Sequence, residues 1–154
     1  NSKNLLLSAK PIDQDQIVAI YHPALHQLNT VADLKSLRLA WNLAYDFGAI
    51  LSLASVGYEV PSVQNGVELA LNQRIDVYLA EQSQIEHYVQ SGKLTLLPLV
   101  AKTIAADDIY AAFADNESGQ RLKCFWDQHF DTALANGQLK QLYQRHANFY
   151  LLPE

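Results

Sequence analysis

The 154-residue sequence contains no methionine, a single cysteine and few basic residues. A translation product begins with methionine, so we expect the chain to be a piece of a longer protein, either a mature product or a fragment. The single cysteine, Cys124, cannot form an internal disulfide, and it leaves the redox compartment open. The net charge of −5 disfavours nucleic acid as a partner, because binding to phosphates requires clustered lysine and arginine.

The sequence also lacks long apolar runs and the common enzyme motifs. No apolar run approaches the ~18 residues that indicate a membrane span. There is no glycine-rich phosphate loop, nucleophile elbow, HExxH or CxxC motif. The five histidines are scattered, and the closest two, His22 and His26, straddle Pro23 in a predicted loop. We therefore expect no metal site and no cofactor.

Strand-like and helix-like segments alternate through most of the chain, which is 49% hydrophobic and 18% charged. Alternation of this kind predicts βαβ units and a largely parallel sheet in an α/β fold, here followed by a helical tail. Apolar and β-branched runs predict strands at 17–22, 37–42, 58–61, 75–80, 94–100 and 109–114. Apolar residues at helical spacing, with capping residues before them, predict helices at 46–57, 63–73, 83–90 and in the region 122–143.

The stretch WNLAYDFG, residues 41–48, is the first candidate binding segment, because it follows a predicted strand at the edge where α/β sheets bind ligands. Free N–H groups at the start of the next helix could hold an anion. Asp46 would instead favour a cationic group, and its structural alternative is a plain N-cap. Four aromatic residues could either form apolar walls of a pocket or pack between sheet and helices: Trp41, Tyr45, Phe47 and Tyr78.

Glu81 is the second candidate, because it follows the predicted strand 75–80 at the same edge of the sheet. A carboxylate there can accept charge-assisted hydrogen bonds from an ammonium group. The alternative is a solvated surface acid at the start of a helix. Asp76 lies at the opposite end of the strand, and we interpret it with Arg74 as a turn or ion-pair element, structural rather than functional.

The order and spacing of these segments resemble family 3 of the type II periplasmic solute-binding proteins, the polar amino-acid receptors of ABC importers. LLLSAKPIDQDQIVAIYH is similar to the family's crossover and the strand after it. TVADLKSLRLAWNLAYDFG is similar to its DLKGK segment and the turn that follows, and GVELALNQRIDVYLAE to its GRxD segment. KLTLLPLV, IYAAFA and WDQHFDTALANGQLKQLYQRH are similar to its closing strands and helices.

The resemblance implies a periplasmic binding protein-like II fold, of which this chain is the later portion. Residues 1–21 would be a lobe-one and hinge segment, residues 22–108 lobe two, and residues 109–154 the return hinge strand with the C-terminal helices of lobe one. The opening strands of lobe one, with the arginine that grips a ligand carboxylate, are not visible in the sequence. Strands near 17–22 and 109–114 would then lack partners, so we expect self-association, exchange of elements with a second copy of the chain, or pairing with the missing N-terminal lobe.

The resemblance implies a non-catalytic periplasmic receptor that closes around a small polar ligand and delivers it to the membrane permease of an ABC importer. Its precursor would carry a signal peptide. The lobe-two ligand contacts of the family fall on Asn42, Ala44, Tyr45, Asp46 and Phe47, and the acid that binds the ligand's α-amino group falls on Glu81.

The sequence departs from the family at three of these positions, so the ligand could be an amine or a modified amino acid. Ala44 replaces a glycine, and Tyr45 and Asp46 stand where small hydroxyl residues are typical. A sensory domain of a signalling protein and a dehydratase-like enzyme on the same scaffold remain alternatives. An enzyme would require a general acid or base in the site, and Glu81 is the strongest candidate.

Overall fold

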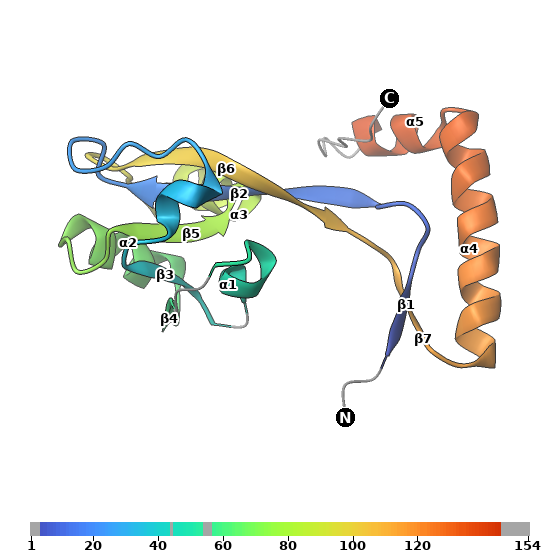
Figure 1. Cartoon of the computed structure of the whole chain (residues 1–154). Coiled ribbons are helices and arrows are strands. Elements are labelled where there is room, and N and C mark those ends of the chain that lie inside the picture. Colours follow the sequence, from blue (N-terminus) through green and yellow to red (C-terminus); the bar gives the residue numbers. More distant parts are fainter. Residues whose placement is uncertain (1–3, 44, 54–56, 146–154) are drawn as a thin grey trace. The chain divides into compact units, whose positions relative to one another are not determined.

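The computed structural model describes residues 4–43, 45–53 and 57–145. Its contacts divide the chain into two compact units (Figure 1). Unit 1 comprises Asn1–Gln14 and Asp108–Glu154, and unit 2 comprises Asp15–Asp107. The assignment of residues 1–21, 22–108 and 109–154 to parts of two lobes stays a prediction.

Unit 2 is built on a five-stranded sheet with the strand order β4-β3-β5-β2-β6. The strands are β2 (Asp13–Tyr21), β3 (Leu39–Asn42), β4 (Tyr58–Val60), β5 (Val77–Glu81) and β6 (Val100–Ile109). Strand β3 pairs in parallel with both β4 and β5, whereas β2 is antiparallel to β5. The α/β class is as predicted, and β2 starts four residues earlier than the apolar run had indicated.

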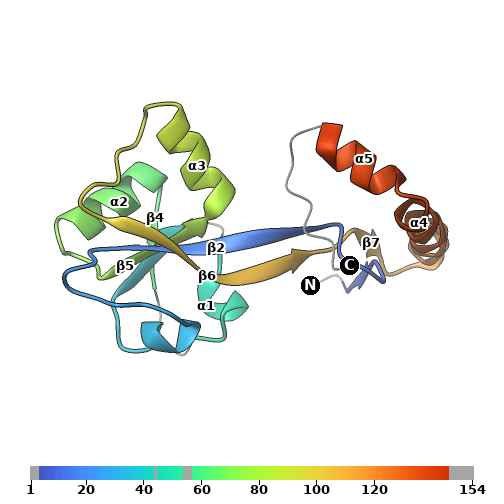
Figure 2. The same cartoon turned by 90° about the horizontal axis from the view of Figure 1, so that it is seen from above.

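Helices cover both faces of this sheet, as the two views of the ribbon show (Figure 2). Helices α2 (Val63–Leu71) and α3 (Gln82–Gln90) lie on one face, while α1 (Phe47–Ile50) and the 3₁₀ turn η1 (Val31–Leu34) lie on the other. Ser62 caps α2, because its hydroxyl accepts a hydrogen bond from the backbone N–H of Asn65.

Successive residues of each strand point to opposite faces, and two hydrophobic clusters result. Val18, Ile20, Ala40, Tyr78 and Ala80 pack with α2 and α3. The opposite cluster contains Ile17, Ala19, Leu39, Trp41, Val77 and Leu79, with Phe47 of α1 and Leu34 of η1. Glu81 continues the alternation of Val77 and Leu79, so it lies on the α1 side of the sheet.

Two predicted elements of unit 2 are wrong in extent or kind. Of the helix predicted over 46–57, the described residues form only the single turn α1, because the chain leaves the helical conformation at Ser52, which has a φ of 52°; residues 54–56 lie outside the described residues. The strand predicted over 94–100 does not form: β6 begins only at Val100, and the side chain of Leu97 is 80% exposed. Pro98 has no N–H to donate to a strand ladder, which explains why an apolar run fails to pair there.

The described residues of unit 1 form a two-stranded antiparallel sheet and two helices. Strand β1 (Leu5–Leu7) pairs with β7 (Ala112–Ala114), and the chain continues into α4 (Glu117–Ala135) and α5 (Gln138–Arg145). Gly119 lets α4 approach β7, because a Cβ there would lie 1.8 Å from the carbonyl oxygen of Ala114. The strand predicted over 109–114 is therefore divided between the end of β6 and the short β7.

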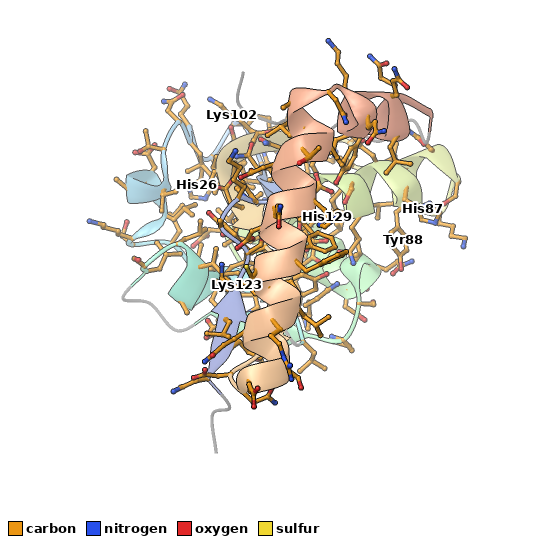
Figure 3. The ribbon with its side chains drawn as sticks, turned by 90° about the vertical axis from the view of Figure 1, so that its right-hand side faces the viewer. His26, His87, Tyr88, Lys102, Lys123 and His129 are labelled. Atoms are coloured by element: carbon orange, nitrogen blue, oxygen red, sulfur yellow. The ribbon has the colours of Figure 1, made fainter. Side chains whose placement is uncertain are left out.

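Helix α4 buries few of its apolar side chains. Of its large apolar residues, Phe130 is buried, whereas Leu122, Phe125 and Trp126 are exposed. Lys123 and His129 lie along the same helix (Figure 3). Lys123 pairs with Asp127, and the ring of His129 stacks on Phe125 with a centroid distance of 3.8 Å. The hydrophobic stripe predicted for this region is real, but much of it faces solvent in this chain.

Candidate functional site

Glu81 occupies the junction between β5 and α3, where it is the N-cap residue of the helix. A carboxylate at an N-cap normally accepts a hydrogen bond from a backbone N–H of the first helical turn. The side chain of Glu81 makes no such bond. It is half-buried; the hydroxyl of Tyr45 donates a hydrogen bond to it, and it shares a hydrogen bond with the carboxyl group of Asp15 when one of the two acids is protonated. The group is therefore oriented by side chains from two other segments of unit 2.

Asp15 is a residue of this site that the sequence analysis missed. It lies on β2, the strand next to β5, and the residue directly opposite Glu81 in the antiparallel pair is Ile17. Because side chains alternate along a strand, Asp15 projects from the same face as Ile17 and reaches Glu81 from two positions away. The strand β2 begins at Asp13, and in DQDQIVAIY the spacing of two residues between Asp15 and Ile17 places both side chains on one face. A predicted strand that began at Asp13 would therefore have located Asp15.

The neighbourhood changes the proton affinity of Glu81. Burial raises the pKa of the Glu81 carboxyl group, and the charge of Asp15 and its hydrogen bond raise that pKa further. The hydrogen bond from Tyr45 acts in the opposite direction, because it favours the ionised carboxylate. The pKa of Tyr45 is itself raised, first by burial and then by the charge of Glu81.

Three aromatic rings lie on the same face of unit 2 as Glu81. The ring of Tyr45 stacks on Phe47 with a centroid distance of 5.4 Å, and Trp41 meets Phe47 edge-on at 6.5 Å. Phe47 and Trp41 are almost completely buried, and only Tyr45 is partly exposed. Phe47 thus packs against Tyr45 and Trp41 packs against Phe47, which is the packing alternative for these two rings, while the hydroxyl of Tyr45 contacts Glu81.

Tyr78 and Asn42 lie on the opposite face of the sheet, in contact with each other. The Tyr78 hydroxyl donates a hydrogen bond of 2.7 Å to Asn42 Oδ1, and Asn42 Nδ2 lies 3.4 Å from Gln84 Oε1. Tyr78 is completely buried, and this burial raises the pKa of its hydroxyl. The expectation that Tyr78 forms an apolar wall of a ligand pocket is not supported by this position. Its ring belongs to the core, and Asn42 binds its hydroxyl.

Of the two remaining predicted positions, Asp46 has a structural role and Ala44 is not described by the structure. Asp46 is exposed and caps α1, accepting a hydrogen bond of 3.0 Å from the N–H of Ala49. This geometry is the plain N-cap alternative. Ala44 lies outside the described residues. The structure therefore brings together Tyr45 and Glu81 from the predicted set, with Asp15 added.

Asp76 forms an ion pair, one of the two structural alternatives expected for it, but its partner is Arg38 and not Arg74. Arg38 Nη2 lies 2.7 Å from Asp76 Oδ1, and the backbone N–H of Arg38 donates to Oδ2 at 2.8 Å. Arg74 contributes only its carbonyl oxygen, which accepts a hydrogen bond from Arg38 Nη1. The hydrogen bonds from Arg38 hold the pKa of Asp76 below its usual value. This cluster joins the starts of β3 and β5, so its role is structural.

Two further features concern the described ranges 4–43, 45–53 and 57–145. No group of three or more potential metal ligands occurs among these residues. None of the helices in this part of the chain is long and apolar enough to cross a membrane.

No protein-family model matches the sequence, and no curated protein matches it either. Solved structures do match. A substrate-binding protein of an ABC uptake transporter from Streptococcus pneumoniae, solved with bound histidine, is 12% identical, with a TM-score of 0.60 over 92% of this chain and 60% of that one. The sensor domain of a histidine kinase with similarity to periplasmic binding proteins is 13% identical, with a TM-score of 0.63 over 92% and 62%.

A third match is an ancestral amino-acid-binding protein, a precursor of cyclohexadienyl dehydratase. It is 10% identical, with a TM-score of 0.58 over 92% of this chain and 60% of that one. At these identities the comparisons show the fold, and the fold is that of the type II periplasmic amino-acid-binding proteins. The resemblance found in the sequence is confirmed at this level. The chain spans about three fifths of the length of these three structures.

Proposed function

We propose that the chain is part of a non-catalytic periplasmic receptor that binds a small polar solute with an amino group, for uptake through an ABC importer. The observation that carries this proposal is the orientation of Glu81. Its carboxyl group leaves the helix start uncapped and is held by Tyr45 instead. A half-buried carboxylate oriented in this way is suited to accept hydrogen bonds from an ammonium group.

The scaffold supports the same class of ligand. One matching structure is a transporter substrate-binding protein with bound histidine, and another is described as an amino-acid-binding protein. On this proposal Glu81 binds the ligand's amino group, and Tyr45 contributes its hydroxyl and the edge of its ring. The remaining ligand contacts would come from parts of the protein beyond unit 2.

This proposal implies two partners: the membrane permease of the importer, and a partner that covers the exposed apolar side chains of unit 1. The exposed apolar side chains of unit 1 favour a covering partner, since a patch of this kind is rarely left in contact with water. They include Leu5, Leu7, Leu122 and Phe125. We propose that either the N-terminal part of the fold or a second copy of the chain covers them.

Two other functions have an observation in their favour. The match to a histidine kinase sensor domain favours a ligand-sensing role, which would require a signalling domain in the parent protein. The raised pKa of Glu81 favours a dehydratase-like enzyme, because a general acid must keep its proton near the working pH. Recovery of the bound ligand unchanged after prolonged incubation would separate a receptor or sensor from an enzyme.

A thermal-shift screen of the full-length protein against amino acids, polyamines and small carboxylates tests the proposal. A ligand present at ~100 times its Kd should add ~2.7 kcal/mol to the free energy of unfolding. We expect an amine-bearing compound to raise the Tm of the wild type and of Glu68→Ala, an exposed acid on α2, but not that of Glu81→Ala. A screen in which no amine-bearing compound shifts the Tm would contradict the proposed ligand class.

A further inference from the structure

We propose that unit 2 carries a second binding site, a groove between α3 and β6 that takes a small apolar molecule with a single cationic nitrogen. The groove has a volume of about 350 Å³, at the low end of the range for small-molecule sites. It lies on the face of the sheet opposite Glu81, because Val18 in its lining belongs to the cluster on the α2 and α3 side. The inference is therefore independent of the proposed function.

The walls of the groove are one side of α3 and one face of β6. Ile85 and Val89 are four residues apart on α3, so they share a side of the helix. Ala101 and Thr103 are two residues apart on β6, so they share a face of the strand. Ile85 is buried in the cluster with Val18 of β2, whereas Ala101 and Thr103 are exposed. Helix α3 thus covers β2 and leaves this part of β6 open.

Apolar side chains form the floor of the groove and part of its rim. Val18 and Ile85 are buried there, and Leu96 packs beside them half-buried. Val89 keeps 42% of its surface exposed, and Ala101 is exposed as well. An apolar molecule in the groove would remove these surfaces from water, which is favourable. The body of the ligand is therefore apolar.

Glu86 gives the groove its charge, because no other acidic and no basic side chain lies among the described residues that line it. Two hydrogen bonds position its carboxylate. The Thr103 hydroxyl donates to Gln82 Oε1 at 3.1 Å, and Gln82 Nε2 donates to Glu86 Oε1 at 2.7 Å. A carboxylate has about four acceptor sites, so Glu86 retains acceptor capacity beside the apolar floor.

The charge of the ligand follows from this carboxylate. An ammonium group complements it, because charge-assisted hydrogen bonds to a carboxylate are stronger than neutral ones. An amino acid does not fit equally well, since its own carboxylate would find no basic side chain in the described lining. The class of ligand is an apolar monoamine, which differs from the amino-acid ligand proposed for Glu81.

The test uses 2-phenylethylamine as the probe and 2-phenylethanol as the matched compound without the charge. Each is titrated into the isotope-labelled, full-length protein, and amide chemical shifts are followed by two-dimensional NMR. Affinities are compared for the wild type, Glu86→Gln and Ala101→Phe, with Glu68→Gln and Ala101→Ser as controls. Position 101 is exposed, so a phenylalanine there fills the groove without disturbing the core. Glu81→Ala, which removes the other proposed amine site, is titrated as well.

We expect saturable changes on residues 85–90 and 100–103, with a Kd on the order of 1 mM for so small a probe. The amine should bind about three- to fivefold more tightly than the alcohol, as for an exposed ion pair. Glu86→Gln should remove this preference, and Ala101→Phe should weaken both compounds by roughly tenfold. The two controls should keep the wild-type affinities, and Glu81→Ala should keep the changes on both segments.

Four results would overturn the proposal or one of its parts. Absence of saturable changes on residues 85–90 and 100–103 at ~10 mM probe would overturn the site itself. Equal affinities of the wild type for the two compounds would overturn the role of Glu86. Undiminished binding to Ala101→Phe would overturn the location. Changes that disappear in Glu81→Ala would assign the probe to the Glu81 site, and the proposed function would then stand without the groove.

Discussion

The close packing of Gly66 against Tyr78 gives a quantitative test of how the core of unit 2 is packed. Gly66 lies inside α2, and a Cβ at this position would be 2.2 Å from Cε2 and 2.3 Å from Cδ2 of the Tyr78 ring. Carbon atoms in contact are normally ~3.5–4.0 Å apart, so the ring would have to move by more than an ångström. The ring is completely buried, and its hydroxyl is tied to Asn42.

We expect Gly66→Ala to lower the free energy of unfolding of unit 2 by about 2–3 kcal/mol. Overpacking typically costs ~1–3 kcal/mol, and loss of the Tyr78–Asn42 hydrogen bond adds ~1 kcal/mol. The better helix propensity of alanine returns up to ~1 kcal/mol. Urea unfolding followed by circular dichroism measures the change, provided that the m-value is unaltered.

Two matched variants separate the steric effect from other causes. Gln64→Ala changes an exposed position of the same helix and should stay within ~0.5 kcal/mol of the wild type. In a Tyr78→Leu background, which removes the ring, the cost of Gly66→Ala should fall below ~1 kcal/mol. A Gly66→Ala variant as stable as the wild type would refute the packing, and with it the role of Tyr78 as a fixed support of Asn42.

Three further predictions concern charge and association. The pKa of Glu81 is raised by burial and by Asp15, so the folded state resists its ionisation; stability therefore falls as the pH rises from the usual glutamate range through the raised pKa. Glu81→Gln should raise the Tm of the ligand-free protein at pH ~8 and have little effect near pH ~4. The pKa of Asp76 is lowered, first by its hydrogen bond from Arg38, so its contribution is present above the usual aspartate pKa and lost as the pH falls through the lowered value. Asp76→Asn should destabilise the protein at neutral pH, and the difference in Tm from the wild type should disappear in acid; a constant difference would contradict this. The isolated 154-residue chain should self-associate in light scattering, and Phe125→Ser should shift it toward the monomer; a wild-type monomer that persists at high concentration would count against an uncovered face on α4.

The sequence predicted the elements whose hydrophobic pattern coincides with their packing. Helices α2 and α3 and strands β3 and β5 lie within two or three residues of their predicted positions, because period-3.6 and β-branched patterns there agree with burial. The segment 94–100 misled the prediction, since an apolar run cannot distinguish a strand from a covering loop, and Pro98 prevents pairing. Strand β6 is polar at its end and carries no strong signal in the sequence.

The candidate site was predictable in part. Glu81 was located from its place after a strand, and Tyr45 from the turn after β3. Asp15 was missed because its role depends on which residues of β2 and β5 are opposite each other. This register cannot be predicted from the sequence of either strand alone. Tyr78 was placed on the ligand side although strand alternation puts it on the face opposite Glu81, and Arg38 could not be distinguished from Arg74 as the partner of Asp76 without the contact itself.

A ligand titration followed by two-dimensional amide NMR of the isotope-labelled, full-length protein tests the central claim most directly. The ligand is the compound that gives the largest thermal shift. If the Glu81 site binds it, the largest chemical-shift changes should fall on residues 13–17, 45–48 and 80–84, and they should vanish in Glu81→Ala. Changes confined to residues 117–145, or unaltered changes in the variant, would place the ligand elsewhere and contradict the assignment of Glu81 as the group that binds the ligand's amine.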